Sequence, residues 1–286
     1  LSKGVSYSFL LFIAIHYFNY HIRQKGRDLL RDVIMLAGLV CFLGLFFRFA
    51  NPGLAMFEES GRFRGMFGNP NGMGVYGTLM FPLFFLYFRL SPHNLSKSLS
   101  TALWAALLIS IFISFSRNAI TTVLIFLFLR RIHKSGRVLP FLFYGFLVPI
   151  MYFLLQPENL IAILEMIGLA EELRADTLLT GSGRVFAWQW ALEESAKSPL
   201  VGRGFAYEEI LFHDYMPEWL YATGHQGGVH NSYLSFMLNT GIIGLINVLS
   251  FFLALSRWVR PSYYRPAILV AAGFSAFFEP WLNSSL

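Results

Sequence analysis

The chain has 286 residues, of which 56% are hydrophobic and only 13% are charged, and its mean hydropathy is +0.55. Soluble globular domains carry about 25% charged residues, so this composition excludes an ordinary soluble protein. The net charge of +6 does not indicate a nucleic-acid partner, because the basic residues follow a membrane-orientation pattern.

Apolar runs recur along the chain, and they predict eight transmembrane helices. The predicted spans cover residues 5–20, 32–50, 72–88, 99–115, 118–129, 138–155, 232–256 and 267–282. The fifth is short and is predicted because it forms a hairpin with the fourth. The expected fold is an all-α polytopic membrane helix bundle in a single domain, residues 1–286. A chain that starts at Leu1 and ends near an apolar segment fits a fragment of a longer protein.

Four short connections hold more than half of the 22 lysines and arginines. They lie at residues 21–31, 89–98, 130–137 and 257–265, and all four fall on one side if eight spans alternate. Cytoplasmic loops are enriched in basic residues, so we predict that this side faces the cytoplasm.

The opposite, extracytoplasmic side receives a long segment at residues 156–231. It contains eleven acidic and four basic residues, and a loop of this length usually has structure and function of its own. An apolar stripe at 158–175 predicts a helix that either lies on the membrane surface or, as we favour, caps a small helical subdomain. A second helix is predicted from after Gly183 to about Ala196, ended by Pro199 and the glycines that follow.

Two arginine clusters on the extracytoplasmic side flank the early spans. The stretch GRFRGMFGNPNGMG (61–74) contains Arg62 and Arg64, which are either substrate contacts or ordinary solvated loop charges. The stretch FSRNA (115–119) places Arg117 in the tight turn between two spans. Charges near membrane depth are costly and tend to mark function, so we predict a functional role for Arg117.

A third cluster, TGSGRVFAWQWAL (180–192), lies in the long loop. Ser182 is the expected N-cap, so Arg184 falls in the first helical turn, where it opposes the helix dipole. A bound anion would relieve that cost, because the free N–H groups and the guanidinium can share it. Trp188 lies on the same helix face and is either a contact for a sugar or lipid headgroup or an interfacial anchor.

The polar triplet His230-Asn231-Ser232 stands directly before a predicted span. His230 is either a functional imidazole at the membrane boundary, with Asn231 available to orient it, or an ordinary packed or solvated side chain. The motifs H-E-x-x-H, C-x-x-C, the P-loop and D-x-D are missing from the sequence, so neither a metal nor a cofactor is predicted. The spans carry almost no charge, which argues against a transporter.

Taken in order, these elements resemble the O-antigen ligase and polymerase superfamily of bacterial envelope glycan transferases. The resemblance covers about residues 61–282 and rests on the three clusters above, on SPLVGRGF and on HNSYLSFMLNTGIIGL. It implies a GT-C-like membrane helix bundle in the bacterial cytoplasmic (inner) membrane, with its active site facing the periplasm. One departure is Asn239, where members often carry glutamate.

The resemblance also implies a reaction. A glycan carried on polyprenyl (undecaprenyl) diphosphate is moved onto an acceptor hydroxyl with inversion and without a metal. Arg184 and Arg117 are expected to hold the diphosphate with help from Arg64, and His230 to deprotonate or position the acceptor. The acceptor is a lipid A-core, a growing polysaccharide or a protein. The alternative is a non-enzymatic membrane protein for polysaccharide export or assembly.

Overall fold

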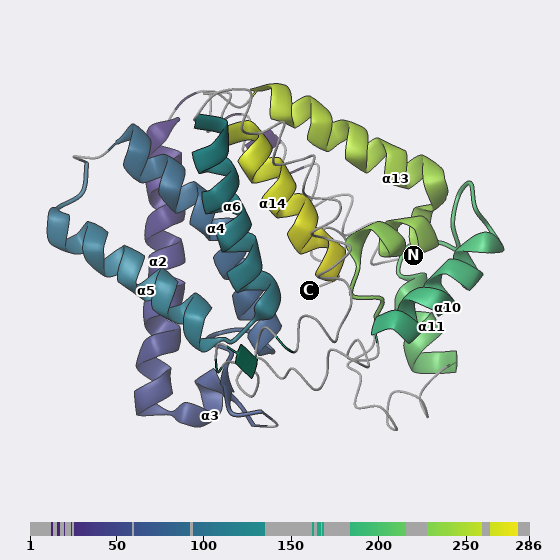
Figure 1. Ribbon diagram of the computed structural model, residues 1–286, viewed down its shortest axis with the longest axis horizontal. Helices are drawn as coiled ribbons and strands as arrows, with labels where there is room; N and C mark the ends of the chain where they lie inside the picture. Colours follow the sequence, from purple (N-terminus) through teal and green to yellow (C-terminus); the bar gives the residue numbers. More distant parts are fainter. Residues whose placement is uncertain are drawn as a thin grey trace. The chain divides into compact units, whose positions relative to one another are not determined.

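The computed structural model describes residues 26–58, 60–91, 94–134, 184–215, 228–258 and 264–279, together with residues 13, 16, 17, 20, 24, 162, 165, 166 and 168. Within these residues the chain is mostly helical, as predicted, with one two-stranded ribbon (Figure 1). The elements are α2 (Arg27–Ala50), α3 (Pro52–Ala55), β1 (Met56–Phe57), β2 (Arg62–Phe63), α4 (Pro70–Leu90), α5 (Lys97–Ile113), α6 (Arg117–Lys134), α10 (Arg184–Ala196), α11 (Tyr207–Tyr215), α13 (Ser232–Trp258) and α14 (Tyr264–Phe278).

Three helical segments in the described part of the chain are long and apolar enough to cross a membrane. They are Asp28–Ala50, Pro70–Leu90 and Ser232–Ser250, and the shorter helices α5 and α14 are also apolar. The count of eight spans is therefore not confirmed and stays a prediction. The spans expected at 5–20 and 138–155, like the helix expected at 158–175, fall almost entirely outside the described residues.

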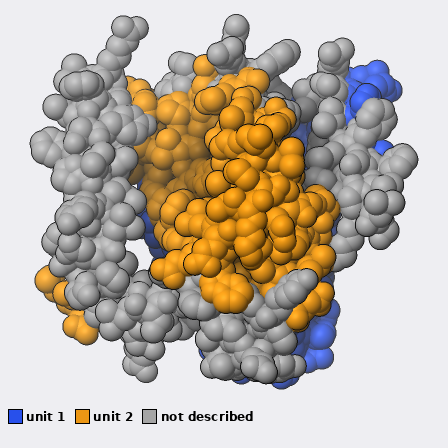
Figure 2. Space-filling model, turned by 90° about the vertical axis from the view of Figure 1, so that its right-hand side faces the viewer, with its two compact units in different colours: residues 1–124 blue, residues 125–286 orange. Residues whose placement is uncertain are grey.

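The chain divides into two compact units, residues 1–124 and 125–286, which Figure 2 shows in different colours. The expectation of one membrane domain over residues 1–286, with a loop subdomain at 156–231, stays a prediction.

In the first unit α2, α4 and α5 pack against one another. Trp104 of α5 lies among aromatic rings of α4, with its centroid 5.4 Å from that of Phe81 and 5.5 Å from that of Phe84. Gly77 lets the two helices approach closely, since a Cβ there would lie 2.3 Å from Ile111. Small residues at such contacts are typical of helix pairs in membranes, where burial of apolar surface does not drive association.

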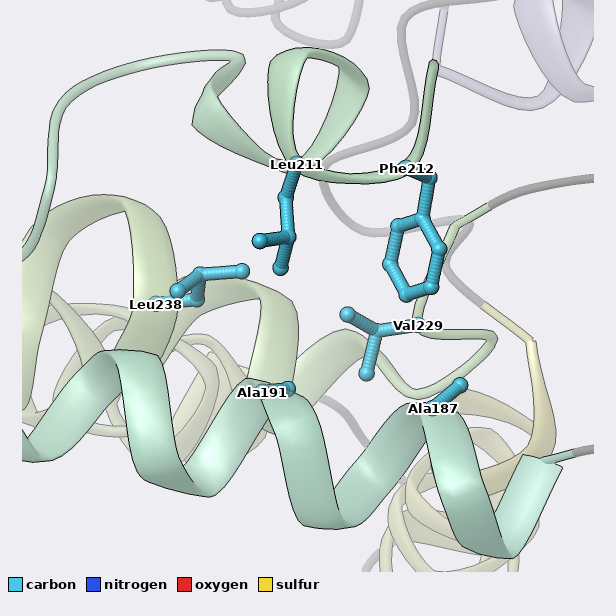
Figure 3. Packing of buried hydrophobic residues seen from close by; sticks show 6 residues of the cluster. All are labelled: Ala187, Ala191, Leu211, Phe212, Val229 and Leu238. Atoms are coloured by element: carbon cyan, nitrogen blue, oxygen red, sulfur yellow. The ribbon is translucent and has the colours of Figure 1, made fainter. Parts of the chain in front are cut away.

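In the second unit α10 and α11 pack against α13. Figure 3 shows the buried cluster between them, Ala187, Ala191, Leu211, Phe212, Val229 and Leu238. Helix α10 confirms the predicted helix and its end near Ala196, whereas the residues before Arg184, where its start was expected, are not described. Ser182, its expected N-cap, lies outside the described residues.

Helix α13 is interrupted at Gly241, whose φ of 66° and ψ of −171° are not helical. The segment that begins at Pro199 packs into this break. Its backbone replaces two hydrogen-bond acceptors of the regular helix. The amides of Ile242 and Ile243 donate to the carbonyls of Pro199 and Leu200 at 2.9 and 3.3 Å. The segment expected to span the membrane at 232–256 is therefore a broken helix.

The carbonyl groups that the break leaves without a helical partner are also paired. The carbonyls of Leu238 and Asn239, which a regular helix would pair with residues 242 and 243, accept from the amides of Arg203 and Gly204 at 2.8 and 3.0 Å. All four backbone groups are thus paired, as an apolar surrounding requires. The inserted segment fixes α10 and α11, which flank it, against α13.

A polar network also ties α10 to α11 through the partly buried carboxylate of Glu194. It pairs with Lys197, accepts from the hydroxyl of Tyr207 at 3.1 Å and lies 3.7 Å from Nε of Arg203. The hydrogen bond from Lys197, followed by that from Tyr207, holds the pKa of Glu194 below its ordinary value of 4.5.

This lowered pKa predicts a loss of stability in acid. The unfolded carboxyl has the higher pKa, so the ionised form stabilises the fold above about pH 4.5, and this contribution disappears as the pH falls through the folded pKa. We expect Glu194→Gln to lower the free energy of unfolding by up to about 1 kcal/mol at pH 7. Thermal unfolding in detergent should show the difference from the unmodified chain shrinking below pH 4.5. A difference that stays constant down to pH 3 would contradict the assignment.

Candidate functional site

In the first unit, two of the predicted arginine clusters come together. Arg62 lies on β2, is buried, and donates from Nε and Nη2 to the carbonyl oxygen of Ser114 at 2.9 and 2.7 Å. Ser114 follows the end of α5 and stands three residues before Arg117. Arg62 therefore supports the turn that carries Arg117, and charge-assisted bonds of this kind contribute about 1.5–3 kcal/mol.

The turn between α5 and α6 is tight, as predicted. Phe115 adopts a φ of 47°, and the hydroxyl of Ser116 accepts from the amide of Ala119 at 3.4 Å. Arg117 is consequently the first residue of α6, at a helix N-terminus.

Arg64 lies half-buried close to the same ribbon. Its Nη2 donates to the carbonyl of Gly53 at 3.0 Å and its Nη1 to that of Gly68 at 3.3 Å. Both guanidinium groups, those of Arg62 and Arg64, thus donate to backbone carbonyls. Their roles in substrate binding, and that of Arg117, stay predictions.

In the second unit, Arg184 is the first residue of α10, and its side chain meets an acid from the far end of the chain. Its Nη2 lies 3.1 Å from Oε1 of Glu279, which directly follows α14. The side chains are 22% and 8% exposed, so the pair is largely withdrawn from water. Removing one partner of an ion pair with little solvent around it is strongly destabilising, because the other charge is left buried and unpaired.

His230 approaches the other oxygen of the same carboxylate. Its Nδ1 lies 3.9 Å from Oε2 of Glu279, beyond hydrogen-bonding distance but within ion-pair range. The structure thus brings two of the predicted site residues, His230 and Arg184, together beside Glu279. Their roles stay predictions.

The backbone that carries His230 is strained and held from both sides. His230 has a φ of 50°, a left-handed conformation that is uncommon for residues other than glycine. The preceding residue, Val229, accepts from the indole N–H of Trp188 at 2.9 Å and donates its amide to the carboxylate of Glu208. Glu208 also accepts from the hydroxyl of Ser235, so α10, α11 and α13 together impose this conformation.

The remaining predicted residues of this unit have structural contacts. Asn231 is buried, and its side-chain oxygen caps α13 by accepting from the amides of Tyr233 and Leu234 at 3.0 and 3.1 Å. Trp188 packs edge-on against Phe277, with ring centroids 5.3 Å apart. Substrate contacts for Asn231 and Trp188 stay predictions.

Two acids of this site were not predicted from the sequence. Glu208 is one of several acids in the long loop, and nothing in its local pattern distinguishes it. Glu279 stands near the end of an otherwise apolar segment, and a charge there is a general signal of function. Asn239, the departure from the family pattern, accepts from the amide of Glu208 at 3.4 Å.

Among the described residues, no group of three or more histidine, cysteine, aspartate or glutamate side chains is arranged to hold a metal ion. This leaves the predicted metal independence untested.

Comparison with known protein families identifies a match over the middle of the chain. A family model described as O-antigen ligase matches residues 101–249, slightly more than half of the chain. The matched region includes Arg117, Arg184, Trp188 and His230, whereas Glu279 lies beyond it. No curated protein and no solved structure matches the chain.

Proposed function

The chain belongs to the O-antigen ligase family, and we propose that it is an integral membrane glycosyltransferase that uses a lipid-linked donor. It moves a glycan from a polyprenyl diphosphate, undecaprenyl diphosphate in bacteria, onto an acceptor hydroxyl. The acceptor is a lipid A-core, a growing polysaccharide or a protein. The apolar helices and the family indicate an integral inner-membrane protein, and we place its active site on the periplasmic side.

One observation carries this proposal. Arg184 and His230 come from separate elements, yet each lies within 4 Å of the same carboxylate, at 3.1 and 3.9 Å. A guanidinium and an imidazole that share one neighbour can also reach one substrate headgroup. Such a pair combines an anion contact with a proton acceptor, the two groups that glycan transfer from a diphosphate requires.

The proposed reaction is a single displacement. The acceptor oxygen attacks the anomeric carbon from the face opposite the diphosphate, so the new C–O bond forms as the bond to the diphosphate oxygen breaks. The electrons of that bond leave with the diphosphate, and Arg184 stabilises the added negative charge. The hydroxyl proton passes to Nε2 of His230, and the configuration at the anomeric carbon inverts.

Arg117 is the proposed second contact for the diphosphate, assisted by Arg64. Arg117 begins α6, and a helix N-terminus adds free N–H groups and a favourable dipole for an anion. Arg62 has the supporting role, since it holds the turn that carries Arg117 through Ser114. Trp188 and Asn231 are proposed to line the donor side near His230.

The proposal is tested by transfer with purified protein. We expect the full chain in detergent to attach the glycan of a polyprenyl-diphosphate donor to an acceptor hydroxyl, and a chelator to leave the rate unchanged. Arg184→Ala should lower the rate by about 10²-fold, the usual effect of removing one oxyanion contact. Arg131→Ala is the matched control, because Arg131 is an exposed arginine of the last turn of α6.

Full transfer by Arg184→Ala would show that the anion contact is assigned wrongly. Absence of any transfer product, combined with loss of surface glycan in a deletion strain, would favour the non-enzymatic export or assembly role.

A further inference from the structure

The carboxylate of Glu279 stands between the two groups to which the reaction is assigned. Oε1 faces Nη2 of Arg184 on α10, and Oε2 faces Nδ1 of His230 ahead of α13. Its main chain is held independently of the side chain. The amide of Glu279 donates to the carbonyl of Ser275 at 3.1 Å, and the hydroxyl of Ser232 donates to the carbonyl of Glu279 at 2.7 Å. The side chain can therefore change partners without moving its backbone.

We propose that Glu279 is a positioning residue that passes from Arg184 to His230 when the donor binds. This inference rests on the proposed function and deepens it. Before donor binding, the carboxylate neutralises Arg184. The incoming diphosphate takes over the guanidinium, and the released carboxylate then accepts a hydrogen bond from Nδ1–H of His230.

Charge balance drives the exchange. A carboxylate that is 8% exposed requires a positive or hydrogen-bonding partner, because burying an unpaired charge is strongly unfavourable. A diphosphate carries more than one negative charge, so it competes for the guanidinium more strongly than one carboxylate does. The imidazole is the next partner, and closing the 3.9 Å separation to a hydrogen bond takes a movement of about 1 Å.

The exchange has a chemical consequence for the imidazole. A hydrogen bond from Nδ1–H to a carboxylate selects the tautomer in which Nε2 is unprotonated and can act as the base. The same carboxylate stabilises the imidazolium that forms when Nε2 takes the acceptor proton, as an acid does in a catalytic triad. The base is then fully prepared only when the donor is in place.

The test separates donor affinity from turnover. Glu279→Gln keeps the shape of the side chain and removes its charge, so Arg184 no longer has a competing anion. We expect the Kd for undecaprenyl diphosphate, the carrier without glycan, to fall by about tenfold. The kcat for glycan transfer should fall by about 10- to 100-fold, since the imidazole loses its partner. A merely structural role would weaken binding and turnover together.

Two further variants keep the test decisive. Glu194→Gln removes a different partly buried, ion-paired glutamate of the same unit and should leave both quantities unchanged. Glu279→Asp retains the charge but withdraws it by one methylene, so it should shift Kd and kcat in the same directions with smaller size. If Glu279→Gln does not fold, the Kd and kcat of Glu279→Asp test the proposal instead.

A Kd that rises or stays the same in the Glu279 variants would overturn the exchange, as would an unchanged kcat. The two proposals fail separately. If the unmodified chain transfers no glycan, the proposed function fails, while the change in undecaprenyl diphosphate affinity still tests the exchange of partners.

Discussion

Replacing His230 by asparagine is expected to lower the rate of glycan transfer by about 10²- to 10⁴-fold, the range that general base catalysis contributes. Asparagine is chosen because it tolerates the left-handed backbone, and the φ of 50° at this position would strain alanine. The variant should fold and bind undecaprenyl diphosphate, since Arg184 remains. Its defect should lie in kcat, with the donor Kd changed little.

His213→Asn serves as the matched control. His213 lies exposed in the last turn of α11, in the same unit, and should be replaceable without effect on transfer. Retention of more than a tenth of the normal rate by His230→Asn would exclude the imidazole as the base. Loss of donor binding in that variant would instead assign His230 to the diphosphate.

Gly241→Ala is expected to destabilise the second unit by about 4 kcal/mol, a size found only for a few mechanisms. Two act together here. The φ of 66° with ψ of −171° is a conformation that only glycine adopts readily. A Cβ would also lie 2.3 Å from the carbonyl carbon and oxygen of Leu200, which are backbone atoms and cannot rotate away.

The expected result is release of the segment that fills the break in α13. Thermal unfolding in detergent should show a lower midpoint, and limited proteolysis should cut faster near Pro199. Transfer should fall as well, because the inserted segment holds α10, and with it Arg184, against α13. Gly204→Ala is the control, since Gly204 also has a positive φ, of 112°, but a Cβ there meets no atom within 4 Å.

The control separates strain from overlap. Gly204→Ala should lose only the strain energy, about 1–3 kcal/mol. An equal effect of both substitutions would mean that close packing at Gly241 contributes nothing.

Several features of this protein follow from local signals in its sequence. The apolar runs predict α2, α4 and α5, and α10 ends at Ala196 as expected, because Pro199 and the glycines after it prevent the helix from continuing. The turn before Arg117 is also local, since a few polar residues between two apolar runs can form only a short connection. Composition likewise determines the membrane environment, because so few charged residues cannot cover a soluble surface.

Which of these helices and turns contact one another was decided only by the tertiary structure. The contact of Arg62 with Ser114 joins residues 52 positions apart, and that of Arg184 with Glu279 joins residues 95 apart. The periodicity of a sequence describes each helix alone and contains no information on such partners.

The break in α13 is equally non-local. The sequence after His230 continues as an apolar run that predicts an unbroken helix, yet four backbone hydrogen bonds to residues 199–204 replace two of its own. Sequence alone thus determined the helices and the residue types that can bind a diphosphate. The packing of distant segments decided that Glu279 lies between Arg184 and His230, because a buried charge takes whichever partner the fold brings to it.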